Sequence, residues 1–73
     1  KISIIEKIKL YLINNNINFI DIDGIKIFND KGSILIRASN TMPKIIMICS
    51  ALYKDNLDIN TEYGENIINK LLN

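Results

Sequence analysis

The 73-residue chain has no histidine, no tryptophan and one cysteine, Cys49. Without histidine it lacks the usual general base near neutral pH and the commonest metal ligand, and a single thiol forms neither an internal disulfide nor a thiolate zinc cluster. The longest apolar run, residues 45–49, is far shorter than the roughly 20 residues of a membrane span. Nine basic and eight acidic side chains nearly cancel, so net charge does not recruit nucleic acid or an anionic membrane. We therefore expect a cytoplasmic protein that binds neither nucleic acid nor membrane.

The length and the hydrophobic content of 48% fit one domain spanning residues 1–73. A chain of this size buries only about 60% of the surface that its unfolded form exposes, which makes a large catalytic cleft improbable. A structured pattern starts directly at Lys1, without an initiator methionine. We expect the chain to be a piece of a longer protein.

Both ends of the chain carry helical patterns. Ser3 and Glu6 have the spacing of a capping box, and the apolar residues behind them recur at helical intervals. This predicts a helix over residues 4–13, which the three asparagines that follow should end. A second apolar stripe predicts a helix between about 55 and 72. Its start is uncertain because Gly64 interrupts the stripe.

Between these helices the apolar residues alternate with a period of two, as in strands. A tight turn at Asp23-Gly24 and another at residues 29–32 separate the first three strands, and a fourth is predicted over 44–52. The fourth strand is apolar on both faces and should lie inside the sheet. The sequence predicts an α+β fold, with a four-stranded antiparallel sheet and two helices on one face.

The segment Arg37-Ala38-Ser39-Asn40-Thr41-Met42-Pro43 differs from the other turns. It combines a guanidinium, two hydroxyls and a carboxamide without a carboxylate, and these donors together suit a phosphate monoester. Each charge-assisted hydrogen bond contributes about 1.5 to 3 kcal/mol, so a few of them can hold a phosphate without a basic domain. The same residues also suit a polar turn whose side chains bond their own backbone. Residue chemistry alone leaves these two interpretations about equal.

Two other patterns favour structural roles. Asp21-x-Asp23-Gly24 starts like a calcium loop, but the later acidic ligands are missing and a hairpin explains it. Cys49 lies among apolar residues, and no histidine is present to activate it. We assign no metal ligand and no catalytic residue to the chain.

The loop motif resembles that of a known family. Arg37-Ala38-Ser39-Asn40-Thr41-x-Pro43, with Asp23-Gly24-Ile25-Lys26-Ile27 and a Lys31-Gly32 turn before it, is similar to the C-terminal domain of the α-D-phosphohexomutases. The similarity is greatest to the bacterial phosphomannomutase/phosphoglucomutase branch and spans nearly the whole chain. It implies a TATA-binding-protein-like fold.

The resemblance also implies a role. Arg37, Ser39, Asn40 and Thr41 would bind the phosphate that is not transferred, on a hexose phosphate substrate. In the parent enzyme, an isomerase that moves a phosphoryl group within the sugar phosphate, a phosphoserine and Mg²⁺ on other domains perform the chemistry. The catalytic serine and the metal carboxylates have no counterpart here, so we expect a monomeric fragment without a cofactor or mutase activity. Met42, Ile46, Ile48 and Ser50 depart from the family pattern outside the four proposed contacts.

Two other functional classes share some features of this chain. Four strands and two helices also describe small RNA-binding modules, but the chain lacks their paired aromatics, a Gly-x-x-Gly clamp and a basic face. A protein-interaction module that pairs through a sheet edge is the other alternative, and no feature of the sequence favours it.

Overall fold

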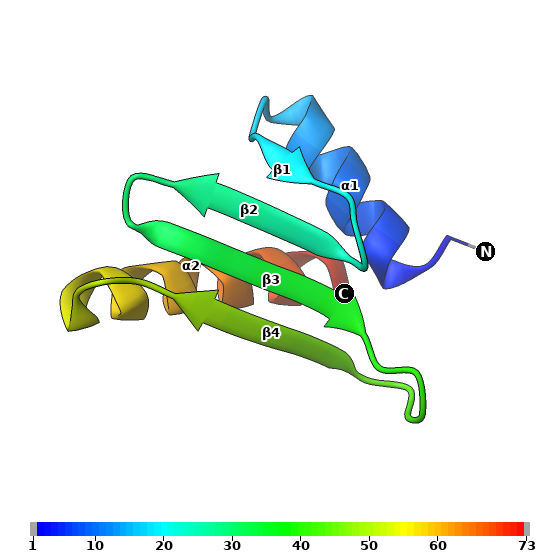
Figure 1. Ribbon diagram of the computed structural model, residues 1–73. Helices are drawn as coiled ribbons and strands as arrows, with labels where there is room; N and C mark the ends of the chain where they lie inside the picture. The colour runs from blue at the N-terminus through cyan, green and yellow to red at the C-terminus, as the bar shows by residue number, and fades with distance from the viewer. Residues whose placement is uncertain (1, 73) are drawn as a thin grey trace.

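The computed structural model describes residues 2–72. The elements are α1 (Ile4–Asn14), β1 (Phe19–Ile20), β2 (Ile25–Asn29), β3 (Gly32–Ala38), β4 (Ile45–Ser50) and α2 (Lys54–Leu72). The strands form one antiparallel sheet in the order β1-β2-β3-β4 (Figure 1). The predicted α+β fold is confirmed, and its likeness to the TATA-binding protein stays a prediction.

Both helices pack on one face of the sheet. In the β2–β3 ladder Ile25 lies opposite Ile36 and Ile27 opposite Ile34. Alternate strand residues share a face, and these four side chains are buried in one core with residues of both helices. The helical members of the core are Ile8, Leu12 and Ile67. Figure 1 shows α2 running behind the sheet. The other face, which we call the open face, carries Ile20, Lys26, Phe28, Leu35, Arg37, Ile46 and Ile48 by register.

The ends of α1 follow the predicted signals. The Ser3 hydroxyl accepts the backbone N–H of Glu6 at 3.2 Å, which is the first half of a capping box. The Glu6 carboxylate lies 3.2 Å from Lys9 Nζ. At the other end Asn15 is the C-cap, and Asn16 has a positive φ of 56°. Asparagine tolerates this left-handed conformation, so the asparagine run ends the helix as predicted.

Gly64 does not interrupt α2, which runs unbroken through it. A Cβ at this position would lie 2.6 Å from Met47 Sδ and 3.2 Å from Ile34 Cγ2. The absence of a side chain therefore lets the helix lie close against β3 and β4. The pattern break in the sequence marks a packing contact between helix and sheet.

The predicted place of the fourth strand inside the sheet is wrong. Within residues 2–72, β4 pairs with β3 alone and forms one edge of the sheet. Its odd-numbered residues are half-buried against the core, while Ile46 and Ile48 lie on the open face. The second apolar face of the strand is thus one that no helix or strand of the described residues covers. Hydrophobic periodicity reports which faces are apolar, and it does not report whether a second strand lies alongside.

A pair of asparagine side chains, of which Asn60 is buried, fastens α2 to the β2–β3 turn. Asn60 is 1% exposed, and its amide donates to Asn29 Oδ1 at 3.1 Å while its own carbonyl accepts from Asn29 Nδ2 at 2.9 Å. Asn29 Oδ1 also accepts the backbone N–H groups of Lys31 and Gly32. The two carboxamides satisfy each other, as buried polar groups require. The turn and the helix are therefore held in one arrangement.

No helix within residues 2–72 has the length and apolar character needed to cross a bilayer.

Candidate functional site

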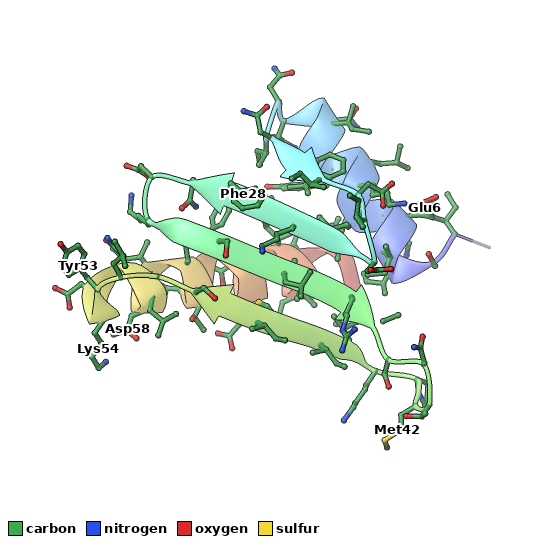
Figure 2. The ribbon with its side chains drawn as sticks, viewed as in Figure 1. Glu6, Phe28, Met42, Tyr53, Lys54 and Asp58 are labelled. Atoms are coloured by element: carbon green, nitrogen blue, oxygen red, sulfur yellow. The ribbon has the colours of Figure 1, made fainter. Side chains whose placement is uncertain are left out.

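The candidate loop projects from one end of the sheet between β3 and β4, with Met42 at its tip (Figure 2). Arg37 is still part of β3 and lies opposite Ile46. The loop closes through two backbone hydrogen bonds, from Ser39 N–H to the Lys44 carbonyl at 2.9 Å and from Lys44 N–H to the Met42 carbonyl at 2.8 Å. The segment from Ser39 to Lys44 is therefore a tight loop with a defined backbone.

Ser39 organises the turn from within. Its hydroxyl oxygen accepts the backbone N–H groups of Thr41 and Met42, each at 3.3 Å, and lies 3.5 Å from Thr41 Oγ1. This is the self-bonded polar turn that the sequence left open, and it is present in the structure. Those two N–H groups point at Ser39. The Ser39 and Thr41 hydroxyls and the Asn40 carboxamide are side-chain groups of this turn that can donate to an anion.

Arg37 and Asn40 border a shallow depression of about 310 Å³, together with Ala38, Ile5 and the Asp23-Gly24 segment. Both side chains are exposed, so their donors can reach a ligand from solvent. Ser39 and Thr41 lie on the same loop but do not line this depression. The structure thus brings Arg37 and Asn40 to one surface and Ser39 and Thr41 to each other.

Asp23 is the residue of this surface that the sequence interpretation missed. Ile20 pairs with Lys26, so the β1–β2 connection is wider than the predicted two-residue turn. Asp23 and Gly24 have positive φ angles of 54° and 115°, and a Cβ on Gly24 would lie 2.7 Å from Arg37 Cβ. Glycine therefore allows the connection to touch the end of β3, which brings the Asp23 carboxylate to the depression. A carboxylate at this place repels a bound anion. The closeness of Asp23 to Arg37 and Asn40 follows from the fold and is not visible in the sequence.

The other acidic residue of this connection has a structural partner. Asp21 lies 2.9 Å from Lys9 Nζ and links the connection to α1. The hydrogen bond to Asp21, followed by that to Glu6, raises the pKa of Lys9 above its usual 10.5. Among residues 2–72 no group of three or more His, Cys, Asp or Glu side chains is placed to hold a metal ion.

A larger hollow lies at the opposite end of the sheet. It has a volume of about 580 Å³ and lies between the β2–β3 turn and the β4–α2 connection, where Phe28, Leu52 and Tyr53 line it. Figure 2 shows Tyr53 at this end and Met42 at the other. The lining is mainly apolar and contains none of the four predicted phosphate contacts. The candidate loop therefore lies away from the larger of these two hollows.

A scan of the chain against protein-family models and a search among curated proteins both return no match.

Proposed function

We propose that this chain is the substrate-phosphate-binding domain of a longer phosphohexomutase of the phosphomannomutase/phosphoglucomutase type. Arg37, Ser39, Asn40 and Thr41 bind the phosphate of a hexose phosphate that is not transferred. The observation that supports this most is that Arg37, at the end of β3, and Asn40 border one depression, while Ser39 and Thr41 lie on the closed loop that contains Asn40.

Each of these residues has a separate part in the proposal. Arg37 supplies a planar fork of N–H donors that matches two phosphate oxygens, and Asn40 borders the same depression with a carboxamide donor. The Ser39 and Thr41 hydroxyls, 3.5 Å apart, can each donate one hydrogen bond to a phosphate at the loop. Asp23 opposes the phosphate charge and limits the affinity of the isolated domain.

The contribution of such a domain to the reaction is positioning. Holding one phosphate fixes the sugar so that its other end meets the phosphoryl group carried elsewhere in the parent enzyme. The residues of this chain transfer no proton and no phosphoryl group in the proposal. The coding region upstream of Lys1 should therefore contain a serine-centred phosphoryl loop and an Asp-x-Asp-x-Asp motif for Mg²⁺. The purified chain alone should not turn over mannose 1-phosphate.

The direct test is calorimetric titration of the chain with mannose 1-phosphate and glucose 1-phosphate. Arg37→Ala should abolish measurable binding, and Arg37→Lys should weaken it because the charge remains while the fork is lost. Lys26→Ala is the matched control, since it removes another cation from the same face of the sheet. Arg37 is exposed, so thermal unfolding should stay unchanged in both Arg37 variants. Lys26 is half-buried and its Nζ lies 5.3 Å from the centre of the Phe28 ring, so the thermal unfolding of Lys26→Ala is measured beside its binding. Equal binding by Arg37→Ala and the parent chain would contradict the proposal.

A further inference from the structure

The outer edge of β4 carries no protection against pairing with another strand. β4 has β3 on one side and no strand of residues 2–72 on the other (Figure 1). In an antiparallel ladder every second residue directs both its N–H and its C=O away from the neighbouring strand. β4 therefore presents a row of backbone donors and acceptors along a six-residue strand.

Natural sheet edges are usually blunted by charged residues, proline, a bulge or very short strands. β4 reads Ile-Ile-Met-Ile-Cys-Ser, without a charge or a proline, and its ladder with β3 pairs residue for residue without a bulge. The opposite edge differs, because β1 has only two residues, Phe19 and Ile20. The sheet thus has one edge that is open to pairing and one that is blunted.

We propose that the occupant of this edge is a second copy of the chain, whose β4 pairs antiparallel with the first and joins two four-stranded sheets into one. One open edge per copy means that the contact uses the same strand twice, so the assembly closes as a twofold dimer and does not grow into a fibre. A twofold axis perpendicular to the sheet keeps all helices on one side. Even-numbered residues of one β4 then lie opposite even-numbered residues of the other, and odd-numbered residues lie opposite odd-numbered ones.

The side chains favour a register with Met47 on the axis. Ile46 of each copy then lies opposite Ile48 of the other, so two isoleucine pairs form on the open face, where Ile48 is 49% exposed in the single chain.

Charge also selects the antiparallel arrangement. The basic residue before the strand, Lys44, lies opposite the neutral Ser50 of the second copy in this register. The two Lys44 residues are then separated by roughly 20 Å along the strands, whereas parallel pairing would place them side by side. The inference does not depend on phosphate binding, and it replaces the monomer expected from the sequence with a dimer.

The test is sedimentation equilibrium of the chain over a wide concentration range, under reducing conditions. One strand pair buries little area, so we expect a reversible dimer whose population rises with concentration. Ile48→Lys should remain folded and monomeric, because it places a charge in the new ladder at a position that is exposed in the single chain. Ile20→Lys is the matched control. It introduces the same charge at a 45% exposed isoleucine of the open face on the far edge, and it should dimerise like the parent chain.

Hydrogen exchange locates the contact. Alternate amides of β4 should become protected as the concentration rises, while the amides of β1 should not change. A chain that stays monomeric up to its solubility limit would overturn the proposal. Loss of the dimer in Ile20→Lys as well as in Ile48→Lys would also overturn it, because two open faces packed together would then explain the association.

Discussion

The Asn29–Asn60 pair allows a quantitative test of how α2 is held to the sheet. Asn60→Ala removes two side-chain hydrogen bonds, of 2.9 and 3.1 Å, from a residue that is 1% exposed. At about 1 kcal/mol for each bond the loss is about 2 kcal/mol. The void left by the carboxamide adds to this loss, and the better helix propensity of alanine offsets up to roughly 0.7 kcal/mol. We expect the free energy of unfolding to fall by about 2 kcal/mol.

Chemical denaturation of Asn60→Ala, Asn29→Ala and the double variant measures this value. The two residues contact each other directly, so the losses should not add, and the coupling energy should be about 1 to 2 kcal/mol. Asn66→Ala, an exposed asparagine of the same helix, is the control and should change stability by less than about 0.5 kcal/mol. Additive losses, or an unchanged midpoint for Asn60→Ala, would refute the reasoning that this pair fastens the helix.

Three further predictions concern the core, an ion pair and the depression. Ile36→Ala, at a fully buried side chain, should destabilise the chain by about 2 to 5 kcal/mol in denaturant unfolding, while Ile22→Ala, at a 70% exposed one, should change it little. The contact with Asp21 raises the pKa of Lys9, so its stabilising effect is complete below about pH 10.5 and is lost as the pH rises through the raised pKa. Asp21→Asn should lower the Lys9 pKa in an NMR titration; an unchanged value would contradict the contact. Asp23→Asn should tighten phosphate binding by a factor of roughly 2 to 10 in calorimetry at low salt, and unaltered affinity would mean that the carboxylate does not act on the ligand.

Local signals predicted most of the fold. The Ser3 cap and the asparagine run define the ends of α1 to within one residue, because both act within a single helical turn. The inward face of β2 and β3 follows from the alternation of isoleucines, which also predicts correctly that Lys26 lies on the opposite face. These features can be predicted from the pattern of residues because they are determined by residues that are close together in the sequence.

The errors concern contacts between segments that are distant in the sequence. β4 lies at an edge although both of its faces are apolar, and Gly64 is a close contact with Met47 although it looks like a helix break. Asn60 interrupts no pattern, and its partner is 31 positions away. Each of these outcomes is decided by which surfaces meet in the folded chain.

For the candidate loop, too, some features could be predicted from the sequence and others could not. Its position between two strands and its donor chemistry could be predicted from residues 37–43. The bonds from the Thr41 and Met42 N–H groups to Ser39 fit the simpler of the two turn interpretations. The approach of Asp23 depends on the left-handed backbone at Gly24 and could not be predicted from the loop itself.

The most direct test of the central claim is an amide NMR titration of the chain with mannose 1-phosphate, beside an identical titration with mannose. We predict saturable shifts at Arg37, Ser39, Asn40 and Thr41 with the sugar phosphate, and no shifts with the neutral sugar. The apolar hollow around Phe28, at the other end of the sheet, should not respond. Shifts confined to that hollow, or a spectrum unchanged by the sugar phosphate at all concentrations, would contradict phosphate binding by the loop.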